Sequence, residues 1–298
     1  MTRAKLRRTT LAAVMLAGLS VSAAAPPIEY TVDTAMLVPV RIGGKPARLR
    51  VSPWAPAAPT LNPGFASAIG LHGGLFGVGV KVGPVKVKGG TSVAKLEFGR
   101  VSFKRRVVWF EKDYDREADA AVGPGGLPVD VVRFRMRAPV AGERSAGLPL
   151  VQAMFQPAYA EVAVGDRKVR VLFDPHRALS LATAGAGQAL VAALGGQLTG
   201  QQGKAEVAFG IDRPVRTLKL THPLAIGPIS LDHITVRVSD NGTTAGIADA
   251  NADPDEIVVT AKGSTDRRDV IILGNDALDQ CSTIVFDKPR KQIQLSCR

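Results

Sequence analysis

The chain contains two copies of one sequence pattern, and this internal repeat restricts the folds it can adopt more than any other feature. The stretch VRIGGKPARLRVSPWA at 40–55 aligns without gaps on VAVGDRKVRVLFDPHR at 162–177. The offset is 122 residues throughout, as between Val40 and Val162. Each copy predicts a strand, a Gly-containing turn and a second strand, and each ends at a Pro-bearing loop.

Three further pairs of segments repeat in the same order. In each copy they are a small-residue segment with helical character, a strand-rich stretch, and an apolar-apolar-Gly segment: 63–71 and 185–196, 98–110 and 226–238, and 120–128 and 271–279. Any two β-rich stretches can look alike, but four matched blocks in one order argue against coincidence. We therefore expect two homologous lobes at 26–137 and 158–298, joined by a linker at 138–157 whose Pro, Gly and charge content is typical of a boundary.

The composition favours many short strands. Gly (31 residues) and Pro (20 residues) are frequent, so turns can be numerous. Val-rich runs recur between Gly, Pro, Asp and Asn, which is the pattern of strands joined by turns. We expect an all-β fold with few short helices.

The N-terminus is typical of a secretory signal peptide at 1–25. Four basic residues precede a short apolar stretch at about 11–21 and small residues at 22–25. We place cleavage within 23–25. A membrane anchor is the alternative interpretation, but the apolar stretch is shorter than the roughly 20 residues that span a bilayer. We expect an exported protein, periplasmic or secreted, with no transmembrane segment after cleavage.

The chain is basic, and removal of the four basic signal residues lowers its formal net charge from +12 to +8. A basic surface can attract nucleic acid, anionic membrane or acidic polymers. Here Lys and Arg are spread along the chain, and no aromatic residues are interleaved with them. We interpret the charge as solvation and expect no nucleic-acid partner.

The two cysteines, Cys281 and Cys297, stand at the ends of CSTIVFDKPRKQIQLSC, which predicts a hairpin. Pairing Val285 with Ile293 brings the cysteines opposite each other, with the paired side chains on one face. Cross-strand cysteines in an oxidising compartment are expected to form a disulfide. A metal site would need more ligands, and a redox centre favours Cys-x-x-Cys, so we expect a structural bridge.

The repeat unit resembles one lobe of the retropepsin-like and pepsin-like aspartic proteases. VRVLFDPHRALSLATAGAGQALVAALGG at 169–196 is similar to the family pattern in which a strand leads to Asp-Thr/Ser-Gly and then a helix. VIILGNDALDQCSTIVFDKPRKQIQL at 270–295 is similar to the family's C-terminal pattern. The resemblance covers roughly residues 36–298. It implies two homologous pepsin-like lobes with a cleft between them.

The resemblance also implies a chemistry that this chain lacks in part. In the family, two facing carboxylates share a proton, and one serves as base on a water while the other serves as acid. The corresponding triplets here are Ser52-Pro53-Trp54 and Asp174-Pro175-His176. Ser52 cannot share a proton as a carboxylate can, and Trp54 places a ring where the family has Gly. Asp174 is therefore expected to be a catalytic remnant, flanked by altered cleft loops.

Other aspartates are poorer candidates for a second acid. Asp33, within Asp33-Thr34-Ala35, precedes the first strand of its lobe, whereas a catalytic triplet follows the strand–turn–strand. We interpret it as a residue at a strand start. We interpret Asp119, Asp276 and Asp287 as turn or cap residues.

Two other kinds of site are a serine nucleophile with a histidine base and a histidine metal site. Ser52 could act as nucleophile with His176 as base, but nothing in the sequence marks an oxyanion hole, and we favour a polar loop role for His176. The four histidines lie far apart in the sequence, so we expect no metal, and no motif indicates a cofactor.

The acidic-then-basic stretch at 248–269 is interpreted as an insertion in the second lobe.

We therefore expect an exported pseudoprotease that binds a peptide or protein in the inter-lobe cleft. The alternative is an active aspartyl endopeptidase or other hydrolase. It would use Asp174 with an unidentified second acid, or Ser52 with His176. The sequence names no substrate, no partner and no oligomeric state.

Overall fold

The computed structural model describes residues 27–33, 36–72, 77–240, 242–250 and 269–298. The predicted signal peptide at 1–25 and most of the insertion at 248–269 lie outside these residues. The described chain is mostly strand, with short helices, which confirms the all-β prediction. None of its helices is long and apolar enough to cross a membrane.

The first repeat unit spans β2 to the 3-10 helix η1. Its elements are β2 (Leu37–Ile42), β3 (Lys45–Val51), β4 (Thr60–Leu61), α1 (Pro63–Ala68), β5 (Gly77–Val82), β6 (Val85–Phe98), β7 (Val101–Phe110), β8 (Ala120–Val122) and η1 (Pro124–Gly126). They form a seven-stranded sheet in the order β2-β3-β8-β4-β7-β6-β5. A further pairing of β2 with β6 closes six of these strands into a barrel around the N-terminal core.

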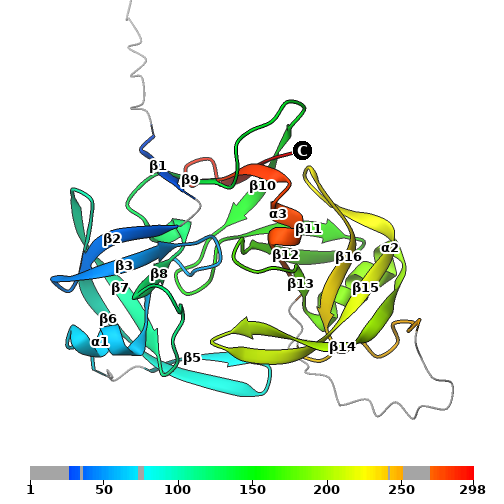
Figure 1. Ribbon diagram of the computed structural model, residues 1–298, viewed down its shortest axis with the longest axis horizontal. Coiled ribbons are helices and arrows are strands. Elements are labelled where there is room, and N and C mark those ends of the chain that lie inside the picture. Colours follow the sequence, from blue (N-terminus) through cyan, green and yellow to red (C-terminus); the bar gives the residue numbers. More distant parts are fainter. Residues whose placement is uncertain (1–26, 34–35, 73–76, 241, 251–268) are drawn as a thin grey trace, which may run out of the picture.

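The second repeat unit spans β11 to α3. Its elements are β11 (Tyr159–Val164), β12 (Arg167–Phe173), β13 (Leu181–Ala182), α2 (Ala184–Leu194), β14 (Gly196–Ala208), β15 (Ile211–Ile226), β16 (Ile229–Arg237), β17 (Val270–Leu273) and α3 (Asn275–Leu278). Its strand order, β11-β12-β17-β13-β16-β15-β14, matches the first unit strand for strand. Figure 1 shows the two units side by side.

The match extends to strand direction. β3 runs parallel to β8 as β12 does to β17, and β4 lies between β8 and β7 as β13 lies between β17 and β16. The tight turns between the first strands also agree, since Gly43 and Gly165 have φ of 58° and 59°. The repeat in the sequence therefore corresponds to two units with the same strand order and the same strand directions.

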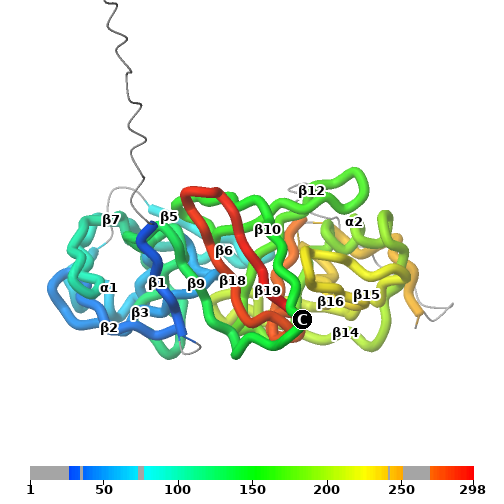
Figure 2. The backbone as a smooth tube through the Cα atoms, turned by 90° about the horizontal axis from the view of Figure 1, so that it is seen from above, coloured from blue at the N-terminus to red at the C-terminus, as the bar shows by residue number. Residues whose placement is uncertain are grey.

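A third group of strands connects the two units. It comprises β1 (Glu29–Val32), β9 (Val131–Arg135), β10 (Arg144–Val151), β18 (Cys281–Asp287) and β19 (Gln292–Cys297). β10 pairs with both β19 and β11, so it joins this group to the second unit. Figure 2 shows β10, β18 and β19 in the middle of the molecule, between the two units. The segment 138–157, which the sequence predicts as a linker, thus contains a paired strand whose Leu148 and Leu150 are buried.

The predicted disulfide is present, but the predicted hairpin register is wrong by one residue. Cys281 lies opposite Cys297 and is bonded to it. Beyond the cysteines, Phe286 rather than Val285 pairs with Ile293, because a β-bulge follows Cys281. Ile284 likewise lies opposite Leu295, so Phe286 and Ile284, instead of Val285 and Thr283, share one face with their partners on β19.

Candidate functional site

A cleft of about 580 Å³ lies between the two repeat units. Ser52, Trp54, Asp174 and His176 all line it, so the structure brings together four of the residues that the sequence singles out. They come from the loops that follow β3 and β12, the corresponding strands of the two units. Pro53 and Pro175 sit in the same loops but do not line the cleft.

The first of these loops is a turn built on Ser52. The Ser52 hydroxyl accepts the backbone N–H of Trp54 at 3.2 Å. The Ser52 carbonyl accepts the N–H of Ala55 at 3.1 Å, and the Ser52 N–H donates to the carbonyl of Val122 on β8 at 3.0 Å. A side-chain oxygen that accepts the N–H two residues on is a common way for Ser to stabilise a turn.

The second loop has the same hydrogen bonds around Asp174. A carboxylate oxygen, Oδ1, accepts the N–H of His176 at 3.2 Å. The Asp174 carbonyl accepts the N–H of Arg177 at 3.1 Å, and the Asp174 N–H donates to Leu273 on β17 at 2.8 Å. The two turns are therefore equivalent in their backbone and differ in their side chains.

A glycine lies behind each turn, at a point where no side chain fits. A methyl group on Gly123 would lie 2.1 Å from the carbonyl oxygen of Ala55. One on Gly274 would lie 2.6 Å from the carbonyl carbon of Leu179. Both are below any normal contact distance, so the apolar-apolar-Gly segments noted in the sequence pass directly against the loops.

Asp174 is the most buried carboxylate of the cleft. Its side chain is 9% exposed, and its Oδ2 lies 3.5 Å from Nε of Arg177. Burial raises the pKa of Asp174 above its ordinary value, although the Arg177 charge and the His176 N–H act in the opposite direction. The carboxylate is thus held by a turn and by one arginine of its own loop.

His176 belongs to a charged network on the other side of the cleft. Its Nε2 lies 3.3 Å from Nη1 of Arg50, which also contacts Asp115 and donates to Glu117 at 2.7 Å. Desolvation and the neighbouring Arg50 lower the pKa of His176. An arginine can only donate, so Nε2 of a neutral His176 accepts this hydrogen bond.

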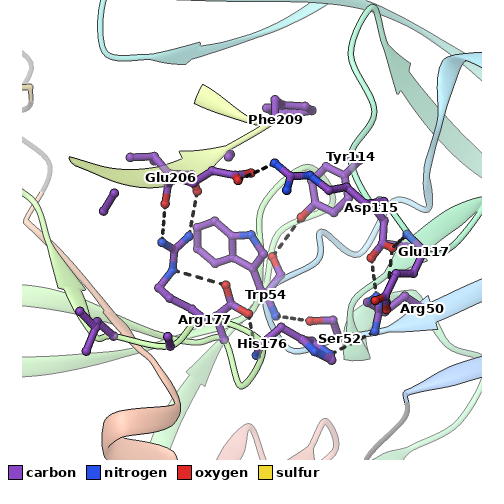
Figure 3. A pocket seen from close by; sticks show the side chains of 18 residues that line it. Arg50, Ser52, Trp54, Tyr114, Asp115, Glu117, His176, Arg177, Glu206 and Phe209 are labelled. Atoms are coloured by element: carbon purple, nitrogen blue, oxygen red, sulfur yellow. Dashed lines mark hydrogen bonds and ion pairs between the residues drawn. The ribbon is translucent and has the colours of Figure 1, made fainter. Parts of the chain in front are cut away.

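Aromatic side chains form another part of the cleft wall. Figure 3 shows Trp54 between Arg177 and Tyr114. The Tyr114 hydroxyl donates to the Trp54 carbonyl at 3.3 Å, and burial raises its pKa, with nearby Asp174 adding to the effect. Phe209 packs edge-on against Tyr114, with ring centroids 5.5 Å apart.

The hairpin of β14 and β15 points from the second unit toward the first (Figure 1), and its residues Glu206 and Phe209 line the cleft (Figure 3). Arg177 donates to the carbonyls of Glu206 at 2.5 Å and Val207 at 2.9 Å. Across the cleft, Arg116 of the first unit forms an ion pair with the Glu206 carboxylate at 2.8 Å. The hairpin tip is therefore fastened to both units.

The sequence missed most of the polar, charged and aromatic residues that line this site. They are Arg50, Tyr114, Asp115, Arg116, Glu117, Arg177, Glu206 and Phe209. The loop DYDRE at 113–117 supplies half of them and lies in the gap between two matched blocks, where the repeat carries no information. Its density of charges around a tyrosine is the one signal that could have marked it.

Three of the other aspartates accept hydrogen bonds from backbone N–H groups. Asp119 accepts the N–H of Arg48 at 2.8 Å, and Asp276 accepts the N–H of Ser180 at 2.8 Å. Asp287 accepts the N–H of Arg290 at 2.9 Å. Asp287 thus has the predicted turn role, whereas Asp119 and Asp276 bind backbone N–H groups 71 and 96 residues away in the sequence. Asp33 follows β1 instead of starting a strand, and it does not line the cleft.

Among the residues that the structure describes, no group of three or more His, Cys, Asp or Glu side chains is arranged to hold a metal ion. The chain matches no known protein family and no curated protein.

Proposed function

We propose that this chain is an exported, catalytically inert relative of the retropepsin-like and pepsin-like aspartic proteases, which binds a peptide or protein segment in the cleft. One observation carries the proposal. The turn at Ser52 reproduces the turn at Asp174 hydrogen bond for hydrogen bond, yet it presents a hydroxyl where that chemistry needs a second carboxylate. A single aspartate cannot share a proton with a serine in the way a carboxylate dyad does.

The remaining acids of the cleft support the same proposal. Asp115, also largely buried, is in an ion pair with Arg50, so its carboxylate faces this arginine. Glu117 pairs with the same arginine and has a side chain 74% exposed. Neither is therefore set up as the acid partner of Asp174.

The alternative, a hydrolase using Ser52 and His176, has less support. The Ser52 hydroxyl is the acceptor of a turn hydrogen bond, and Nε2 of His176 lies against Arg50. A base that activates a serine must accept its proton at hydrogen-bond distance. Both side chains are engaged with other groups, and these contacts do not form a Ser52–His176 pair.

The cleft suits a binding role. Its volume is in the range of sites that hold small molecules or a few peptide side chains. It combines an aromatic wall with charged groups held in fixed places, which is the usual composition of a specific binding site. The disulfide between Cys281 and Cys297 supports an oxidising, exported location.

Cleavage of a diverse peptide library by the purified, oxidised chain, from acid to neutral pH, tests the proposal. We expect no cleavage at any pH, together with retention of a subset of peptides by the folded protein. Asp174→Asn is measured in parallel. Cleavage that disappears in this variant would contradict the proposal and restore the aspartic-protease alternative.

A further inference from the structure

We propose that the cleft selects a peptide with a positively charged side chain, and that Arg177 occupies the position of that charge from within the chain. This inference rests on the proposed function and specifies the ligand of the same site.

The cleft carries more negative than positive charge, in contrast to the rest of the molecule. Its lining contains four carboxylates and three guanidinium groups, with His176 neutral at physiological pH: Asp115, Glu117, Asp174 and Glu206 against Arg50, Arg116 and Arg177. The whole chain has a formal net charge of +12. A local excess of acid on a basic protein attracts cations to this place and not to the remaining surface.

Arg177 has the contacts that a bound basic side chain would have. Its Nε faces the Asp174 carboxylate at 3.5 Å, and its guanidinium carbon lies 5.8 Å from the centre of the Trp54 ring. Its two terminal nitrogens donate to the carbonyls of Glu206 and Val207. A carboxylate, an aromatic face and two carbonyl acceptors together form a site for a cation.

Arg177 fills this site imperfectly. Its Nε is buried but makes no hydrogen bond, since the Asp174 oxygen is beyond hydrogen-bond distance. The two residues are three apart in one turn, which fixes how the guanidinium can approach the carboxylate. An arginine that enters from the cleft is free of this restriction and can form the paired N–H···O bonds that guanidinium and carboxylate favour.

The aromatic wall adds to the preference for a cation. Trp54, Tyr114 and Phe209 line one cavity with the carboxylates, and the Arg177 guanidinium lies over the Trp54 ring. Aromatic faces attract cations and also pack against the apolar stem of Lys or Arg. The site therefore offers contacts for the whole length of such a side chain.

The test compares two peptides that differ only in one side chain, arginine in one and the neutral isostere citrulline in the other. The sequence around it is taken from a peptide retained in the library experiment, and affinities are measured by calorimetry on the full mature chain. We expect the arginine peptide to bind about tenfold more tightly, because charge-assisted hydrogen bonds are about twice as strong as neutral ones. Asp174→Asn should remove this preference. The matched substitution Asp166→Asn, in an exposed turn away from the cleft, should leave it unchanged.

A second variant tests the role of Arg177. Arg177→Ala removes the internal cation and should strengthen binding of the arginine peptide several-fold, whereas Arg144→Ala on the surface should not. Equal binding of the two peptides by the wild-type chain would overturn this inference and leave the proposed function standing. Failure of every library peptide to bind the folded chain would overturn the proposed function as well.

Discussion

The turn at Ser52 and the turn at Asp174 share their backbone hydrogen bonds and differ in almost every side chain. Each first residue accepts the N–H two residues on, and each donates its own N–H to the strand that passes behind. Ser and Asp can both fill this role because each has a side-chain oxygen at a similar reach. The comparison teaches that the fold requires an acceptor at these positions, whereas the chemistry of the cleft depends on which acceptor it is.

The strongest way to break the equivalence is to fill the space behind each turn. Gly123→Ala should destabilise the chain by about 3 kcal/mol or more, since the added methyl meets a backbone oxygen at 2.1 Å. Gly274→Ala, with a closest approach of 2.6 Å, should cost about 2–3 kcal/mol. Chemical denaturation measures both, with Gly64→Ala as control, because nothing lies within 4 Å there. A Gly123→Ala variant with the same free energy of unfolding as wild type would contradict the close packing at this glycine.

An exchange of the two acceptors sharpens the comparison. Ser52→Asp should keep the turn but place a carboxylate at a site 4% exposed, at a cost of about 2–3 kcal/mol at neutral pH. Asp174→Ser should cost about 1 kcal/mol or less, because serine serves the same turn in the first unit. Denaturant midpoints measure this difference. An Asp174→Ser cost as large as that expected for Ser52→Asp would show that serine does not replace the Asp174 carboxylate as the acceptor of this turn.

Substitution of the two arginines that contact the hairpin tip should lower the stability by smaller amounts. Arg177→Gln removes two hydrogen bonds from a side chain that is 14% exposed and should cost about 2 kcal/mol. Arg116→Gln removes an exposed ion pair and should cost less than about 0.5 kcal/mol. Thermal unfolding of both variants provides the measurement. The reverse order would mean that the first unit, and not the second, holds the hairpin.

The smallest expected effects concern pH, and only the second turn has groups that titrate. The raised pKa of Asp174 lets the folded chain keep a proton that the unfolded chain loses, so stability falls as pH rises from about 4 through the raised value. The lowered pKa of His176 acts in the opposite sense, so stability falls as pH drops below about 6.5.

Unfolding curves at a series of pH values separate these two contributions. Asp174→Asn should be more favourable relative to wild type at pH 7 than at pH 4, because the asparagine cannot ionise. His176→Gln should lose less stability than wild type between pH 7 and pH 5. Ser52→Ala, in the turn without titrating groups, should lower the free energy of unfolding by the same amount at every pH.

Much of the fold could be predicted because the repeat reports on strands and turns. The matched blocks correspond to paired strands with the same order in both units, and the offset found at Val40 and Val162 holds for the first two strands of each unit. The bulge after Cys281 was not predictable, since a strict alternation of residues carries no sign of an inserted one. Similarly, the strand at Arg144–Val151 depends on partners more than a hundred residues away.

The site was predicted only where the repeat covers it. Ser52, Trp54, Asp174 and His176 line one cleft because the equivalent loops of the two units face each other. Tyr114 and Glu206 come from segments without a matched partner. Their position depends on how a loop of one unit and a hairpin of the other approach in space, which a one-dimensional pattern does not record.

The most direct test of the central claim is the fate of a bound peptide. A peptide from the retained subset is incubated with excess protein at pH 4 and at pH 7, and the bound fraction is recovered and weighed by mass spectrometry. The equivalence of the turns, with a single carboxylate between them, predicts that the peptide is recovered intact at both pH values. Recovery of two fragments, with the peptide left whole by Asp174→Asn, would contradict it.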